Sequence, residues 1–196
     1  MKWVKQSIHY WCPDTKEHKF LGQNVTVAIL DTGISPHPDF KDRILSFRDF
    51  SSTTGSSEKV LFSFSHFSPL IDNSGHGTHV AGILAGSGLL SSGTYAGIAP
   101  FCNLIIGKVL DQNGNGSIKN VINGIQWIRD IYTQFHIRII NISVGTRPDL
   151  SIHQKLLLLN AVESLWDLGL VVVVSAGNYG PAPGSVTVPG SSPKVI

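Results

Sequence analysis

Three short polar segments, each next to an apolar run, carry the side chains that could do chemistry in this chain. The segments are Asp-Thr-Gly at 31–33, His-Gly-Thr-His at 76–79 and Ser-Ala-Gly-Asn at 175–178. A hydroxyl attacks an amide when a base takes its proton, a carboxylate orients that base, and a donor stabilises the oxyanion. Asp31, His76 and Asn178 have suitable side chains for the carboxylate, the base and the donor. We therefore expect Asp31 within hydrogen-bond reach of His76, and Asn178 open to the same cleft.

Each of these residues also has a purely structural interpretation. Asp31 could cap a turn, as Asp-Thr-Gly sequences do, and Asn178 could be a turn asparagine. His76 and His79 could hydrogen-bond to backbone at the edge of the core, or form an H-x-x-H metal pair. No third ligand at a useful spacing and no adjacent glutamate supports a metal site there. Taken singly, the residues leave these alternatives open.

Four short apolar runs predict the strands that would position these segments. They cover residues 24–30, 104–110, 138–144 and 170–175, and they are rich in Val, Ile and Leu. Continuous apolar runs of this length are typical of strands buried on both faces, as in parallel sheets. The first run leads into Asp31 and the last leads into the 175–178 segment. The polar segments are therefore expected at or near strand ends.

Helical periodicity alternates with these strands. Apolar residues recur at three- and four-residue steps after Ser117, a suitable N-cap. A second helix is predicted over about 152–168, ending at Gly169, and the apolar residues after His76 indicate a buried helix. The alternation predicts an α/β fold with three layers, a parallel β-sheet with helices on both faces. In such folds ligands bind beyond the carboxyl ends of the strands.

Three segments have neither helical nor strand periodicity and are predicted to be loops. They are residues 49–70, which are rich in Ser, Thr and Phe, residues 86–97, and the Pro- and Gly-rich residues 180–193.

The composition is that of one globular domain without a strong electrostatic field. Of 196 residues, 42% are apolar and only 14% are charged, with a formal net charge of +2. Such weak, scattered charge predicts no nucleic-acid or anionic membrane partner. The apolar runs are far shorter than the roughly 20 residues that span a bilayer. The two cysteines, Cys12 and Cys102, are expected to be free thiols, with a single bridge as the open alternative.

The N-terminal part has no element of the predicted fold. The first 13 residues lack the apolar stretch and the small-residue cleavage site of a signal peptide, so a cytoplasmic location is expected. Residues 1–23 are predicted to be an N-terminal extension, too short for a separate prodomain.

Together, the segments resemble those of the subtilisin-like serine proteases. Residues 27–34 resemble that family's aspartate segment, residues 75–82 its histidine segment and residues 174–178 its oxyanion segment. The resemblance covers about residues 20–196 and implies a serine endopeptidase in which His76 is the base, Asp31 orients it and Asn178 binds the oxyanion. It also implies an extended polypeptide substrate, bound by strand addition. The residues that would hold this substrate are Gly114, Asn115, Gly116, Ser143, Val144, Gly145, Ala176 and Gly177.

The chain departs from this family in a way that bears directly on the chemistry. The family's nucleophile lies in a later Gly-Thr-Ser segment, and no Gly-Thr-Ser occurs in these 196 residues. Ser143 and Ser175 fall in predicted strands, while Ser191 and Ser192 lie in the Pro- and Gly-rich loop. Residues 24–196 are therefore expected to be a partial peptidase domain, incomplete at its C-terminus, and inactive or nearly so alone.

Two other interpretations of the chain stay open. It could be a non-catalytic remnant or interaction protein that binds extended peptides, or a fragment whose missing C-terminal portion is a separate partner chain. The unpaired sheet edges of an incomplete domain predict poor solubility or such a partner. No cofactor is expected. Calcium is not assigned: the family resemblance places Asp39 where a calcium ligand can occur, but residues 87–95 do not resemble a tight calcium loop.

Overall fold

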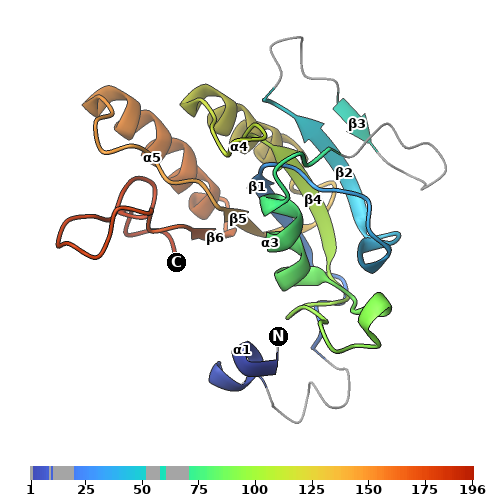
Figure 1. Ribbon diagram of the computed structural model, residues 1–196. Helices are drawn as coiled ribbons and strands as arrows, with labels where there is room; N and C mark the ends of the chain where they lie inside the picture. The colour runs from blue at the N-terminus through green and yellow to red at the C-terminus, as the bar shows by residue number, and fades with distance from the viewer. Residues whose placement is uncertain (1, 9, 11–19, 52–57, 61–70) are drawn as a thin grey trace.

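A computed structural model describes residues 2–8, 10, 20–51, 58–60 and 71–196 (Figure 1). Predictions about Cys12 and about most of the 49–70 loop lie outside the described residues. The centre of the structure is a six-stranded sheet with the strand order β3-β2-β4-β1-β5-β6. Its strands are β1 (Thr26–Asp31), β2 (Ile44–Asp49), β3 (Glu58–Val60), β4 (Asn103–Lys108), β5 (Ile137–Ile142) and β6 (Val171–Val174).

The four predicted strands are β1, β4, β5 and β6, and they run parallel to one another. Their observed ends differ from the predicted ones by at most two residues. Two further strands correct the prediction. β2 pairs parallel with β4, and β3 pairs antiparallel with β2, so the sheet is not wholly parallel and residues 58–60 are not loop. A short connection in sequence allows this antiparallel pairing, whereas a parallel pair needs a long crossover.

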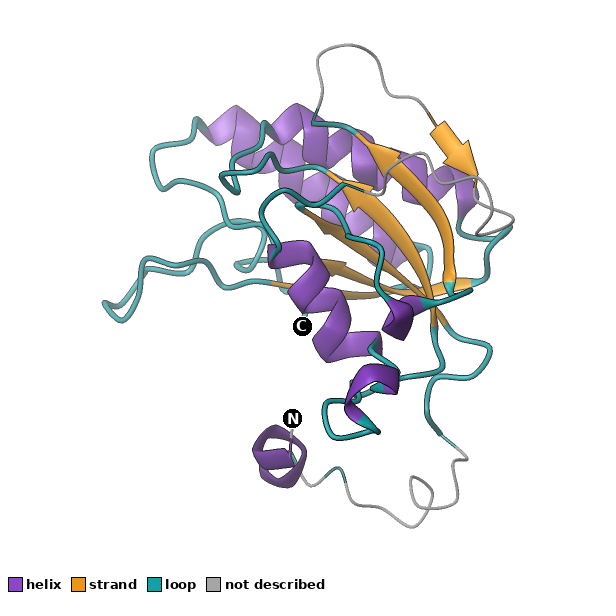
Figure 2. Cartoon of the chain, turned by 45° about the vertical axis from the view of Figure 1, so that its right-hand side comes forward, coloured by secondary structure: helices purple, strands orange, loops and turns teal. Residues whose placement is uncertain are grey.

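Helices cover both faces of the sheet, as predicted. One face carries α3 (His76–Ala85), and the other carries α4 (Ile118–Ile131) and α5 (Ile152–Asp167), as Figure 2 shows. Alternate side chains of the central strand β1 pack on opposite faces of the sheet. Ala28 and Leu30 belong to the core under α4 and α5, and Val27 and Ile29 to the core under α3. The predicted three-layer α/β fold is therefore confirmed.

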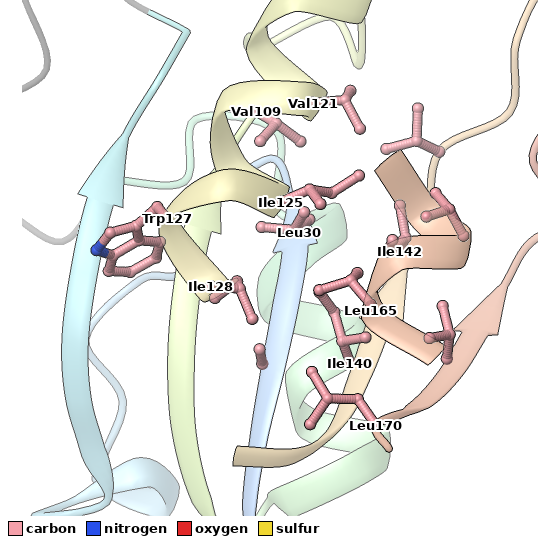
Figure 3. Packing of buried hydrophobic residues seen from close by; sticks show 14 of the residues in the cluster. Leu30, Val109, Val121, Ile125, Trp127, Ile128, Ile140, Ile142, Leu165 and Leu170 are labelled. Carbon is pink, nitrogen blue, oxygen red and sulfur yellow. The ribbon is translucent and has the colours of Figure 1, made fainter. Parts of the chain in front are cut away.

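The larger core explains why α4 and α5 pack on one face. Ile125 and Ile128 of α4, Leu165 of α5 and Ile140 of β5 belong to one buried cluster that fills the space between helices and sheet (Figure 3). All four side chains are essentially inaccessible to solvent, and burying each contributes roughly 1.5–3 kcal/mol. The face of α4 that carries the three- and four-residue repeat is the face that packs.

Local signals set the ends of these helices. Ser117 accepts a hydrogen bond from the backbone N–H of Asn120 at 3.1 Å, which confirms it as the N-cap of α4. Ser151 and Gln154 form a capping box at the start of α5. After α5, Gly169 takes a φ of +81° and turns the chain toward β6.

The remaining helices among the described residues are short. They are α1 (Lys2–Ser7), which lies in the predicted extension, and two 3₁₀ turns at Pro38–Phe40 and Leu89–Ser91. The second turn corrects the prediction that residues 86–97 have no regular structure. It forms because backbone N–H groups of Gly88 and Leu90 donate to the carboxylate of Asp39, at 2.9 and 3.3 Å. Each oxygen of the Asp39 carboxylate thus accepts one backbone N–H group, so that Asp39 connects the first 3₁₀ turn to the second. No helix of the described residues is long and apolar enough to span a membrane.

Cys102 is a free, buried thiol with 1% exposure. Burial raises the pKa of this thiol to about 11, and the nearby charge of Arg43 opposes the shift only partly. The reactive species is the thiolate. At pH 8 we expect iodoacetamide to alkylate Cys102 at least about 100-fold more slowly in the folded chain than in denaturant. Peptide mapping by mass spectrometry measures both rates, and equal rates would contradict this burial.

Candidate active site

The expected pair of Asp31 and His76 is present. Asp31 ends β1 with a fully buried side chain, and His76 is the first residue of α3, with 56% of its side chain exposed. The Nδ1 atom of His76 lies 2.7 Å from Oδ1 of Asp31. That oxygen also accepts a 2.7 Å hydrogen bond from the N–H of Thr32. A carboxylate so fixed favours a proton on Nδ1 and leaves Nε2 as the basic nitrogen.

Two glycines allow the helix start to approach the strand end this closely. A Cβ atom on Gly77 would lie 2.3 Å from the carbonyl oxygen of Gly33 and 3.2 Å from the Cβ of Asp31. Gly33 itself has a φ of +115°, and a Cβ there would lie 2.1 Å from the carbonyl oxygen of Ile71. Neither position has room for a side chain. Gly33 and Gly77 thus allow the close approach that brings His76 to Asp31.

Asp72 lies in the loop before α3, and its carboxylate accepts five hydrogen bonds. Its Oδ1 accepts from the hydroxyl of Thr32 at 2.8 Å and from the N–H groups of Ser74 and Gly75. Its Oδ2 accepts from the N–H of Thr78 at 2.8 Å and from the Thr78 hydroxyl at 2.5 Å. Burial alone would raise the pKa of Asp72, but these bonds outweigh it and hold the pKa below its ordinary value. An aspartate shortly before a helix start is the sequence signal that could have indicated it.

A cavity of about 870 Å³ opens beside the pair. His76 and Asn178 both line it, so the expectation that they share a cleft is met. Two loops form its walls, residues 113–117 after β4 and residues 143–147 after β5. The cavity therefore lies where ligands of α/β folds bind, beyond the carboxyl ends of parallel strands.

The cavity walls contain six of the eight residues predicted to hold substrate. They are Gly114, Asn115, Gly116, Ser143, Val144 and Gly145. Ala176 and Gly177 are absent from the described lining. Gly177 instead packs against a neighbouring loop, because a Cβ there would lie 2.4 Å from Oγ1 of Thr187. The Ala176 carbonyl accepts the N–H of Thr187 at 3.0 Å, which braces the turn that presents Asn178.

Both walls are held by hydrogen bonds within the loops. Asp111 accepts the N–H groups of Asn113 and Asn115 at 2.8 and 2.9 Å, and its own N–H donates to the carbonyl of Asn115. On the other wall, the hydroxyl and the N–H of Thr146 both donate to the carbonyl of Val188. The cleft thus has ordered walls.

Helical residues add an apolar side to the cavity that the sequence patterns did not reveal. Ile118 and Val121 from α4 and Leu158 from α5 line it. Their periodicity marks them only as residues of a packed helix face, because core and pocket residues follow the same repeat. His79 is exposed on α3 and is not part of the lining. In the described part of the chain, no group of three or more His, Cys, Asp and Glu residues is placed to hold a metal.

The fold and the site define an α/β protein with a histidine–carboxylate pair beside a cleft at the carboxyl ends of a parallel sheet. Residues 22–196 match the model of the subtilase family of peptidases. The chain belongs to that family. It is 42% identical over 180 residues to Serine protease AprX of Bacillus subtilis (strain 168), and 37% identical over 161 residues to the Major intracellular serine protease of the same strain. Among solved structures, Sphericase superposes with a TM-score of 0.75 at 29% identity.

The matches cover most of this chain but a smaller share of its relatives. They include 89% of the chain and 38% of AprX, 81% of the chain and 44% of the Major intracellular serine protease, and 89% of the chain and 53% of Sphericase. The chain therefore spans about half, or less, of the length of the proteins that it resembles.

Proposed function

We propose that this chain supplies the base, its orienting carboxylate, an oxyanion donor and the substrate cleft of a serine-type endopeptidase. The observation that carries the proposal is the 2.7 Å contact of His76 with buried Asp31, beside a cleft that Asn178 also lines. Because no Gly-Thr-Ser segment occurs in the 196 residues, the nucleophilic serine would come from polypeptide outside them. The chain alone would then be inactive or nearly so.

The geometry supports the following roles for the residues. Nε2 of His76 would take the proton of the serine hydroxyl as its oxygen attacks the substrate carbonyl, and would later give that proton to the leaving amine. Asp31 would hold Nδ1–H and stabilise the imidazolium while it exists. The Asn178 amide would donate to the oxyanion, an interaction worth roughly 3–4 kcal/mol in the transition state.

The substrate would be an extended polypeptide. Residues 114–116, which follow β4, and residues 143–145, which follow β5, both line the cleft. A peptide laid between two extended edges gains main-chain hydrogen bonds from both, and its side chains enter pockets alternately. The apolar side of the cavity at Ile118, Val121 and Leu158 supports apolar substrate side chains.

The sheet edge at β6 supports the proposal that further polypeptide carries the nucleophile. Ile196 already pairs with the outer edge of β6, donating its N–H to Val172 at 2.9 Å and accepting the N–H of Val174 at 3.0 Å. A longer extended segment would pair with this edge in the same way. Val171 of β6 is partly exposed, and a segment that continued the sheet would cover apolar surface at this edge.

A second candidate function is binding of extended peptides without catalysis. It is favoured by the walls of the cleft, which the loop hydrogen bonds of Asp111 and Thr146 hold without any nucleophile segment. In that case peptide binding would be the whole function, and adding further polypeptide would create no hydrolysis.

The test of inactivity compares the purified 196-residue chain with its His76→Ala variant. We expect the two to hydrolyse an unfolded protein substrate at the same background rate, since covalent acyl transfer needs the nucleophile. A serine-directed fluorophosphonate should label neither. Labelling of the unmodified chain that His76→Ala abolishes would show that a serine within these residues acts as nucleophile, and would overturn the missing-nucleophile argument.

A further inference from the structure

We propose that Asp72 is a positioning residue for the His76–Asp31 pair, acting through Thr32 and through the first turn of α3. The inference deepens the proposed function and rests on it, because it assigns a task to a residue that would touch neither substrate nor reacting atoms. The observation behind it is that the five donors of Asp72 come from three places: the end of β1, the loop before α3, and the first turn of α3.

Thr32 connects the carboxylate of Asp72 to both members of the pair. Its hydroxyl donates to Asp72 and accepts the N–H of Gly77 at 2.9 Å. Thr32 directly follows Asp31, and Gly77 directly follows His76. Each member of the pair is therefore one residue away from the same buried hydroxyl, whose residue is only 1% exposed. A substitution at Asp72 would therefore affect the positions of both Asp31 and His76 through the Thr32 hydroxyl.

Thr78 gives the network a second connection. Its hydroxyl donates to Asp72 and accepts the N–H of Ser35 at 3.0 Å, so the chain beyond β1 is fastened to α3 as well. Together the two threonines fix the distance and the rotation of the helix start relative to the strand end. Threonine in both positions offers one donor and an acceptor on a stiff side chain.

Only a carboxylate suits this set of donors. An ionised carboxylate accepts on both oxygens and donates nothing, whereas an amide has one accepting oxygen and an NH₂ group that donates. Asparagine at this position would therefore face either the Thr32, Ser74 and Gly75 donors or the Thr78 donors with the wrong group. The negative charge is also favourable at the N-terminus of a ten-residue helix.

The imidazole of His76 depends on this backbone placement because little else holds it. More than half of the side chain is exposed, and within the described residues Asp31 is its one hydrogen-bond partner. If the first turn of α3 shifts, the Nδ1 contact lengthens and the ring can take its other tautomer. The tautomer of His76 therefore indicates whether the first turn of α3 holds the imidazole in place against Asp31.

The experiment measures that tautomer by NMR in the full 196-residue chain with ¹⁵N-labelled histidine, at a pH where the ring is neutral. The His76 signals are identified by their loss in His76→Gln. The unmodified chain should show mainly the Nδ1–H form. Asp72→Asn should raise the ratio of Nε2–H to Nδ1–H at least about fivefold, the change expected from losing one ordinary hydrogen bond.

Matched variants separate positioning from general damage. Asp130→Asn removes an exposed carboxylate of α4 that accepts one side-chain bond from Gln126, and it should leave the ratio unchanged. Thr32→Val removes the shared hydroxyl and should raise the ratio, whereas Thr32→Ser keeps the hydroxyl and should not. Circular dichroism monitors folding, and if Asp72→Asn does not fold, the two Thr32 variants decide.

The outcomes distinguish the inference from the proposed function beneath it. Absence of the Nδ1–H form in the unmodified chain would contradict the His76–Asp31 pair itself, and with it the proposed function. A normal ratio in the unmodified chain that neither Asp72→Asn nor Thr32→Val changes would overturn the positioning role alone. Unfolding of both variants would also overturn it, because Asp72 would then stabilise the fold rather than position the pair within it.

Discussion

His76→Ala should lower peptide hydrolysis about 10⁶-fold, and Asp31→Asn about 10⁴-fold, once the chain is complemented by a polypeptide that carries the nucleophile segment. These magnitudes are the losses measured when triad members are removed from serine proteases, subtilisin among them. The physical reason is that base and carboxylate act as a unit with the serine. Without His76 the hydroxyl keeps its proton, and without the Asp31 carboxylate the imidazole loses its tautomer.

The measurement mixes the chain with the C-terminal portion of a subtilisin-like protease and records initial rates on an unfolded protein substrate. His79→Ala is the matched control: it removes an exposed histidine from the same helix and should leave the rate within about threefold, as expected of a surface change remote from the chemistry. Complementation that restores a cooperative fold but gives no hydrolysis would contradict the peptidase proposal and favour the peptide-binding alternative.

Gly77→Ala should destabilise the chain by about 1–3 kcal/mol and separate His76 from Asp31, because the added methyl group has no space. Its nearest neighbours would be the carbonyl oxygen and nitrogen of Gly33, at 2.3 and 3.1 Å. These are backbone atoms at the end of the central strand, so the helix must move instead. Urea unfolding followed by circular dichroism gives the change in free energy.

The same helix offers a control with the opposite sign. A Cβ atom on Gly82 would meet nothing within 4 Å, and alanine in a helix interior is better than glycine by about 0.5–1 kcal/mol. We therefore expect Gly82→Ala to be slightly more stable than the unmodified chain. Equal stabilities for the two alanine variants would contradict the close approach of α3 to β1.

The parts of the fold that sequence patterns predicted are those set by local physics. The apolar runs of β1, β4, β5 and β6 are continuous because both faces of those strands are covered, and Ser117 caps α4 through its own hydroxyl. β2 was not predicted, because Ser46 and Arg48 interrupt its apolar residues and pairing with β4 is what makes it a strand. β3 has only three residues and lies at the sheet edge.

The sequence predicted the part of the candidate site that the motif residues form with one another. It did not predict the parts that depend on contacts with residues far away in the sequence. Asp31, His76 and Asn178 were expected together and share one site. Asp72 has no apolar pattern around it, and its link to Thr32 spans 40 residues of sequence. From the sequence, Gly177 could line a pocket or allow another part of the chain to come close to the backbone. The structure shows the second: Thr187, ten residues later, lies against Gly177.

The central position of β1 also sets the order in which the molecule can assemble. β1 pairs with β4 on one side and β5 on the other, and both partners are far from it in sequence, beyond whole helices. Long loops must close before either pairing gains energy, and proteins dominated by such contacts fold slowly. Asp31 reaches its final surroundings only after β1 has paired with β4 and β5. During synthesis the apolar β1 segment is therefore made first and stays without these two partner strands until they have been synthesised.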